Sequence, residues 1–274
     1  MRSLLVFALL PAALSAAPAL AIVRPVVSQM EGGEADPPGF EHAGGETLFF
    51  SCRVSGFAKT EENKIHMAYS VQAFDPKGAP LAEIYKNEIS EEVLPQDKDW
   101  QPKIETSLAV PPLVPPGAYK ILVKVEDLVA KTSAELPVPF RIRGRTVAPN
   151  DSLAVRNFRF YRREEDAQPL AKAAYRVGDE LWAKFDIVGY KYGPNNKVDV
   201  SYVVSILSAS GRVLWTQPDP AAEQSESFYP KPYVPAVMNL DLKTVKPAEY
   251  TMLVQVKDAM GKQAIETRQT FTVE

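Results

Sequence analysis

The 274-residue chain has very little of the chemistry that common catalytic and metal sites need. It contains one cysteine and two histidines, His42 and His66. The motifs His-Glu-x-x-His, Cys-x-x-Cys and Gly-x-Ser-x-Gly are absent from the sequence, and these motifs mark zinc sites, redox sites and activated serine nucleophiles. We therefore expect a protein that is not an enzyme, with no catalytic residue, no cofactor and no metal ligand set.

The single cysteine excludes an intramolecular disulfide. Cys52 lies in the apolar, strand-like run Leu48–Val54. A reactive thiol needs an exposed, electropositive setting, whereas a cysteine among apolar neighbours usually packs in a core. We predict a buried, unreactive Cys52.

An excess of positive charge is also missing. The sequence has 31 Lys and Arg against 34 Asp and Glu, a formal net charge of −3. Nucleic-acid binding depends on clustered basic residues. This balance argues against nucleic acid as a partner.

Long hydrophobic runs are absent after residue 21. Residues 1–21 combine Arg2, an apolar segment and the small-residue pattern Ala19-Leu20-Ala21, which is typical of a cleaved secretory signal. The alternative is a retained membrane anchor, but the run is short for a span and contains Pro11 and Pro18. We predict cleavage after Ala21 and an exported protein, periplasmic or extracellular, without a stable membrane span.

The sequence does contain an internal repeat. Gly45-Glu46-Thr47-Leu48 matches Gly178-Asp179-Glu180-Leu181, and further matches continue in the same order to Phe140 and Phe271. A period of this length exceeds a solenoid unit and suits a whole domain. The prediction is one domain over 22–143, a Pro- and Gly-containing linker over 144–152 and a second copy over 153–274.

Both copies show the two-residue alternation of half-buried strands, clearest in Tyr119–Glu126 and Tyr250–Lys257. Helical periodicity is not evident, and Pro- and Gly-containing turns separate the runs. Other expected strands are 24–30, 47–54, 65–74, 81–85, 134–142, 154–161, 180–188, 198–207, 213–216 and 264–273. This pattern predicts an all-β protein, a tandem pair of immunoglobulin-like antiparallel β-sandwiches, with an up-and-down barrel as the alternative.

One motif also supports a family resemblance. The pattern Pro-Gly-x-Tyr-x-Ile-x-Val-x-Val-x-Asp over 116–127, after a Gly-Glu-x-Leu strand and an Asp-Pro-x-Gly turn, resembles the immunoglobulin/fibronectin-type sandwich modules of bacterial exported proteins. The Cys…Trp…Cys core of antibody domains is missing. The resemblance implies a fold and no activity.

Two pairs of repeated polar residues have alternative interpretations. Asp127 and Asp258 end alternating strands, where a carboxylate either ligates calcium or accepts backbone N–H groups in an Asx-type turn. Tyr119 and Tyr250 follow a proline-containing turn. They either stack on a ligand or form a corner in which the hydroxyl bonds to a neighbouring loop. We favour the turn and the corner.

The candidate contact residues lie where the two copies differ. The segments 190–196 and 228–233 break the repeat, and 228–233 is aromatic and Pro-rich where the first copy is charged. Exposed aromatic rings on loops suit protein or glycan contacts, and loops packed over their own sandwich end would look the same. The candidates are Tyr190, Tyr192, Phe228, Tyr229 and Tyr233.

A basic series precedes an acidic one at the start of the second copy. Four arginines are followed directly by Glu164-Glu165-Asp166, which indicates a solvated strand edge whose charges pair with one another. The arginines are Arg156, Arg159, Arg162 and Arg163.

These features favour an exported, non-catalytic binding or adhesion-type protein. Its partner would be a protein or a cell-envelope polysaccharide. The alternative is a structural spacer or an assembly subunit of a cell-envelope complex.

Overall fold

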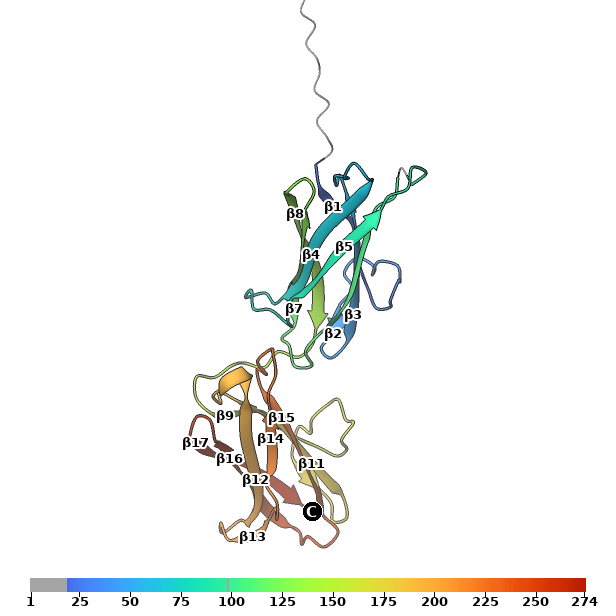
Figure 1. Ribbon diagram of the computed structural model, residues 1–274. Helices are drawn as coiled ribbons and strands as arrows, with labels where there is room; N and C mark the ends of the chain where they lie inside the picture. The colour runs from blue at the N-terminus through green and yellow to red at the C-terminus, as the bar shows by residue number, and fades with distance from the viewer. Residues whose placement is uncertain (1–18, 98) are drawn as a thin grey trace, which may run out of the picture.

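The computed structural model describes residues 19–97 and 99–274 and shows an all-β chain (Figure 1). Most of the predicted signal peptide, residues 1–18, lies outside the described residues. The only helical element in the described chain is a single 3-10 turn, η1 (Pro194–Asn196). The described residues contain no helix of the length and apolarity that a membrane span requires.

The N-terminal half, residues 21–143, contains two sheets. One has the strand order β1-β3-β6 and the other β2-β8-β7-β4-β5. Apolar residues of both sheets share one buried cluster, which is consistent with a β-sandwich. The strands are β1 (Ala21–Ser28), β2 (His42–Ala43), β3 (Thr47–Ser55), β4 (Lys64–Phe74), β5 (Tyr85–Glu92), β6 (Lys103–Ala109), β7 (Gly117–Asp127) and β8 (Thr132–Arg143).

The C-terminal half, residues 154–273, repeats this plan. A sheet β15-β11-β9 faces a sheet β10-β17-β16-β12-β13, in which β14 also pairs with β12. The strands are β9 (Ala154–Tyr161), β10 (Ala174–Tyr175), β11 (Glu180–Val188), β12 (Val198–Ser208), β13 (Val213–Thr216), β14 (Ala221–Ser225), β15 (Val234–Asp241), β16 (Ala248–Asp258) and β17 (Gln263–Val273).

All strand pairs among the described residues lie within one half or the other. The halves follow each other end to end in Figure 1. Pairing is antiparallel, except that the two-residue strands β2 and β10 run parallel to β8 and β17.

The corner tyrosines recur at equivalent places in the two halves. The Tyr119 hydroxyl donates to the carbonyl of Pro115 (2.6 Å), and the Tyr250 hydroxyl donates to the carbonyl of Lys246 (2.7 Å). Both rings are buried. The corner interpretation is confirmed, and each hydroxyl is used within its own half.

The repeated aspartates cross-link loops in the same way. The carboxylate of Asp127 accepts the N–H groups of Ala58 (2.7 Å), Val129 (2.9 Å) and Ala130 (3.1 Å). Asp258 accepts those of Lys191 (3.0 Å) and Gly261 (2.9 Å). The turn interpretation is confirmed for Asp127. Its carboxylate ties the loop before β4 to the turn after β7, and that of Asp258 ties the loop before β12 to the turn after β16.

A glycine permits this loop to leave its strand in the C-terminal half. Gly189 has φ +73°, and a Cβ there would lie 1.9 Å from the carbonyl oxygen of Ser152. A side chain would therefore require both a strained backbone and a displaced segment. The matching Gly56 also has φ +73°.

The expected strand over 81–85 is wrong. Leu81 is buried beside a bend, and the strand starts at Tyr85 and continues to Glu92. We did not expect β5, β6, β14 or β15. β5 is exposed along nearly its whole length, so its sequence lacks the apolar alternation that identifies a half-buried strand.

Cys52 is buried on β3, as predicted, with 1% of its surface exposed. Burial raises the pKa of the thiol from 9.0 to about 12, because the thiolate would lose its hydration. The thiol form is therefore favoured in the folded protein.

We expect Cys52 to resist alkylation while the protein is folded. At pH 8 a thiol reagent should react on the order of a thousandfold more slowly than in urea, since the thiolate is the nucleophile and its fraction falls with the raised pKa. Mass spectrometry of timed samples measures the rate. Equal rates with and without urea would contradict the burial of this side chain.

Candidate functional site

The five predicted contact residues gather around one loop, Ser227–Pro235, at the junction of the two halves. Tyr190, Tyr229 and Tyr233 are buried, whereas Tyr192 and Phe228 are exposed. The hydroxyls of Tyr190 and Tyr192 both donate to the carbonyl of Lys231, and their ring centroids are 5.5 Å apart. These contacts hold the loop in a fixed shape.

Tyr229 crosses from the C-terminal half into the core of the N-terminal half. Its ring belongs to the buried cluster formed by residues of β3, β4, β7 and β8. Its hydroxyl donates to Oδ2 of Asp75 at 3.0 Å, and both groups are buried. Burial first and the Asp75 carboxylate second raise the pKa of Tyr229, so the phenol stays protonated and continues to donate.

Asp75 is prepared for this contact by the turn that it caps. Its Oδ1 accepts the N–H groups of Lys77 (2.8 Å) and Ala79 (2.7 Å). The second oxygen, Oδ2, is thereby turned toward Tyr229. We call Asp75, Leu81 and Pro111–Leu113 the junction socket. Asp75 bonds to Tyr229, Leu81 shares a buried cluster with it, and Leu81 and Pro111–Leu113 line one cavity together with the loop.

A second connection anchors the predicted linker. Arg145 forms a bidentate pair with the buried carboxylate of Asp186, at 2.6 and 2.7 Å. Its guanidinium carbon also lies 5.0 Å from the ring centroid of Tyr233. The Asp186 carboxylate raises the pKa of Arg145, so this cation is permanent. Linker and loop are thus held to each other by the same side chain.

An open cavity of about 620 Å³ remains beside the loop at the junction. Its walls combine the socket with Phe228 and Pro230 of the loop. Exposed Phe228 is the part of the predicted contact set that remains free to meet a ligand here, together with Tyr192 nearby.

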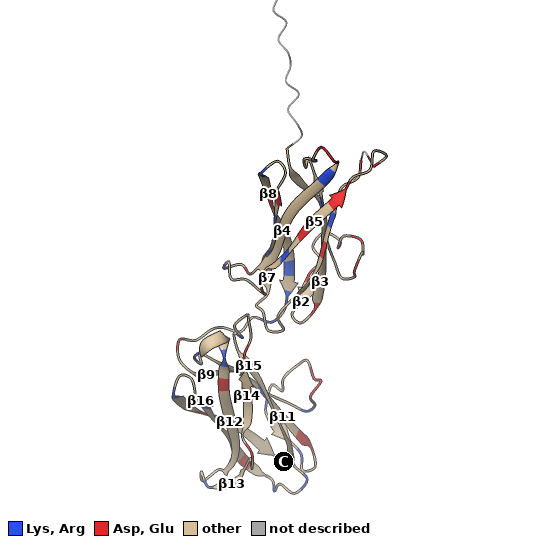
Figure 2. Cartoon of the chain, in the orientation of Figure 1, with Lys and Arg blue, Asp and Glu red and all other residues tan. Residues whose placement is uncertain are grey.

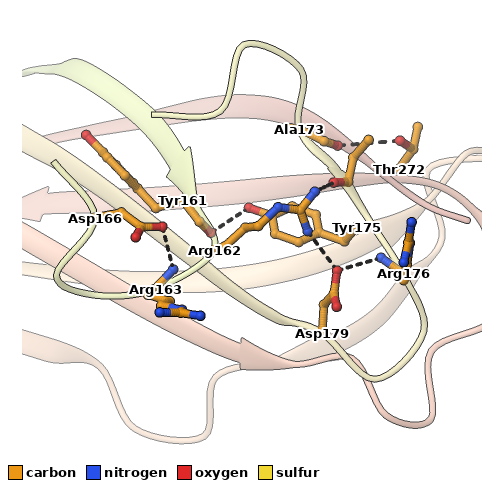
Figure 3. A network of polar contacts seen from close by, with 10 residues as sticks. Tyr161, Arg162, Arg163, Asp166, Ala173, Tyr175, Arg176, Asp179 and Thr272 are labelled. Atoms are coloured by element: carbon orange, nitrogen blue, oxygen red, sulfur yellow. Dashed lines mark hydrogen bonds and ion pairs between the residues drawn. The ribbon is translucent and has the colours of Figure 1, made fainter. Parts of the chain in front are cut away.

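The arginine series has partners other than those expected (Figure 3). Arg162 pairs with Asp179 at 2.9 Å and donates to the carbonyl of Ala174, and its guanidinium carbon lies 5.7 Å from the ring centroid of Tyr175. In the acidic run, Asp166 accepts the backbone N–H of Arg163. These contacts tie the loop after β9 to the entrance of β11, which is a structural role.

The sequence predicted the strand over 213–216, which is β13, but it did not reveal that this apolar segment is exposed. Val213, Leu214 and Trp215 are all exposed, and β13 lies at the edge of its sheet, paired only with β12 among the described strands. The sequence signal for this exposure is a run of three consecutive apolar residues in a short strand. Successive strand residues point to opposite faces, so the three side chains cannot all be buried on one face.

Beside β13 lies a larger open cavity of about 990 Å³, which we call the end cavity. Its lining includes residues of β13, and β13 lies at the end of the C-terminal half away from the junction in Figure 1. Its apolar lining includes Leu214, Trp215, Leu240, Leu242, Val245, Pro247, Tyr250 and Phe271.

The edge of the N-terminal half is different. β5 carries Lys86, Glu88, Glu91 and Glu92, and Figure 2 shows acidic segments along it. Charged edges prevent the association of sheets, whereas apolar edges invite it. Of these two edge strands, β13 is therefore the one suited to a partner.

The histidines take part in local ion pairs. His42 lies 2.9 Å from Asp36 in the N-terminal half, and exposed His66 lies 3.0 Å from Glu88. Within residues 19–97 and 99–274, no group of three or more His, Cys, Asp and Glu side chains is arranged to hold a metal ion.

No protein-family model and no curated protein matches the sequence. Two of the solved structures that match this chain are as follows. A chain described as the Streptococcus agalactiae AgI/II polypeptide BspA C-terminal domain has a TM-score of 0.31 and 11% identity, covering 92% of this chain and 100% of that one. A second, described as BspA_C_WT, has a TM-score of 0.30 and 12% identity, covering 94% and 100%.

We expect Tyr229→Phe to destabilise the N-terminal half although residue 229 belongs to the C-terminal half. Removing the hydroxyl leaves Asp75 Oδ2 buried without its donor, at a cost of about 1–3 kcal/mol in the free energy of unfolding. Hydrogen exchange of amides in β4 and β7 measures this change.

Tyr192→Phe is the matched control, since it removes a hydroxyl from the same cluster but from an exposed ring. Its exchange should match that of the unmodified protein. Equal exchange in both variants would mean that the Tyr229 hydroxyl does not stabilise the N-terminal half.

Proposed function

We propose that this is an exported, non-catalytic binding protein made of two tandem immunoglobulin-like sandwiches, and that it binds a protein partner at β13 and the end cavity. The observation that carries the proposal is the exposed apolar edge Val213–Trp215 beside a cavity of about 990 Å³. Contiguous apolar surface of this kind marks interaction sites in soluble proteins.

A protein suits this surface better than a polysaccharide does. Sugar sites need aromatic platforms with polar groups around them, and three of the five aromatic candidates are used inside the junction. The end cavity has mainly apolar walls, and such walls fit apolar and aromatic side chains.

Site-specific photo-crosslinking tests the proposal. A benzophenone amino acid replaces Trp215 in one variant and Tyr85 in the other, and these residues match in type and exposure (39% and 38%). We expect one protein adduct of defined mass from position 215 in the native envelope fraction, absent from position 85 and lost with Leu214→Asp.

The adduct must form again when the partner, identified by mass spectrometry, is added in pure form. Equal adducts from both positions, or none from position 215, would refute binding at β13. Retention of the protein on cell-wall polysaccharide despite Leu214→Asp would instead favour a glycan partner.

The second candidate function is a spacer or assembly subunit of a cell-envelope complex. It is supported by the junction, where Tyr229 bonds to Asp75 of the N-terminal half and Arg145 anchors the linker to the C-terminal half. A spacer must keep a fixed length, and two independent contacts restrict bending.

We expect Tyr229→Ala combined with Arg145→Ala to loosen the junction while both halves stay folded. Small-angle X-ray scattering should then require a mixture of orientations, whereas one orientation should fit the unmodified protein and Leu214→Asp. Identical scattering curves would show that these two contacts do not set the orientation.

A further inference from the structure

The end cavity and the junction socket occupy equivalent places in the two halves. The Gly45 N–H donates to the carbonyl of Val110 (3.0 Å), and the Gly178 N–H donates to that of Leu242 (3.2 Å). The sequence repeat places Leu81 opposite Leu214 and Asp75 opposite Ser208. One kind of surface is therefore built twice.

One copy of this surface is covered and the other is open. Leu81 is 3% exposed beneath the loop that carries Tyr229, whereas Leu214 is 46% exposed. The C-terminal counterparts of the socket residues line the end cavity instead. The internal junction thus shows what such a surface accepts: an aromatic ring on a loop stiffened by Pro230 and Pro232.

Two substitutions between the copies change what fits. Ser208 replaces Asp75, and its hydroxyl accepts the Arg212 N–H (3.2 Å) and pairs with Ser210 (2.9 Å). The free carboxylate oxygen that receives a phenol in the socket has no counterpart here. Trp215 replaces Ala82 and adds a broad apolar wall. The cavity therefore suits a ring that needs no hydroxyl.

The charges around the end cavity are mixed. Arg212 and Lys246 line it together with Asp241 and Glu249, and Figure 2 shows both signs near β13. A surface of mixed sign gives no net attraction to a polyanion or a polycation. This favours an uncharged apolar segment as the occupant.

A second copy of this chain does not present such a loop. The repeat places Gln96 opposite Tyr229 and Asp97 opposite Pro230, at the far end of the N-terminal half. In a second copy Tyr229, the ring that enters the socket, is already buried in that copy's own junction. The occupant must therefore come from another protein.

We propose that the end cavity binds a proline-flanked aromatic loop on a sandwich module of a partner protein, repeating the contact that the N-terminal half makes with Ser227–Pro235. This inference rests on the proposed function and adds to it the class of partner and the manner of docking. The contact joins the end of one module to the opposite end of the next.

The probe is a cyclic peptide of residues 225–236 of this chain, added to the labelled full chain and followed by NMR. We expect amide shifts of residues 208–215 and 241–250. They should disappear with Leu214→Asp and persist with Ile84→Asp, a control with matched exposure (46% and 44%). The same peptide should also bind the socket vacated in the full-length Tyr229→Ala variant, which sets the sensitivity of the assay.

The hydroxyl of Tyr229 in the peptide distinguishes specific docking from nonspecific hydrophobic binding. A Tyr229→Phe peptide should bind the vacated socket about tenfold more weakly, because the buried hydrogen bond to Asp75 is lost. It should bind the end cavity as well as the parent peptide does. Replacing the same tyrosine by alanine should abolish binding at both places.

Binding to the vacated socket without shifts at the end cavity would overturn the inference. So would concentration-dependent self-association of the unmodified chain that Leu214→Asp abolishes, since the occupant would then be a second copy. If a partner crosslinks at position 215 but the peptide does not bind the end cavity, this inference fails and the proposed function stands. If no partner crosslinks and the peptide does not bind, the inference and the proposed function both fail.

Discussion

The arrangement of the two halves depends on one buried contact, the hydrogen bond from Tyr229 to Asp75. The phenol completes the apolar core of a half to which it does not belong, and the carboxylate that receives it is itself fixed by a turn. Without this bond, Asp75 Oδ2 and the Tyr229 hydroxyl would both be left in a buried setting without the partner that the structure gives them. Stability and orientation are therefore coupled at this point. The pair of Arg145 with Asp186 supports the same arrangement from the linker side.

The junction socket and the end cavity, which occupy equivalent places in the two halves, differ at few positions, but these differences have a large effect. A carboxylate at residue 75 holds a phenol permanently, whereas a hydroxyl at residue 208 satisfies only its own turn. A small residue at 82 leaves space for a loop of the same chain, and a tryptophan at 215 offers a surface to another. Duplication thus supplies two docking surfaces, of which one is used internally and the other stays available.

The sequence predicted the strands that have one buried face, because burial imposes alternation on segments such as Tyr119–Glu126. It could not indicate β5, in which seven of the eight residues are exposed, and the alternation of Ile104 and Leu108 in β6 was too brief to stand out. The sequence showed that the aromatic loop differs between the two copies, but it did not show that Tyr229 of this loop packs in the core of the N-terminal half. The contact of Tyr229 spans 154 positions of the chain, and local patterns carry no information at that range. The exposure of β13 is likewise a tertiary property.

The insertion of Tyr229 also affects the order in which the core of the N-terminal half can be completed. During synthesis the N-terminal half leaves the ribosome first, while the ring that closes its core is still untranslated. At ordinary elongation rates the gap lasts on the order of ten seconds. Until that ring has been made, the buried cluster that contains Leu81 lacks one of its members. The core of the N-terminal half can therefore be completed only after the chain has been made through residue 229.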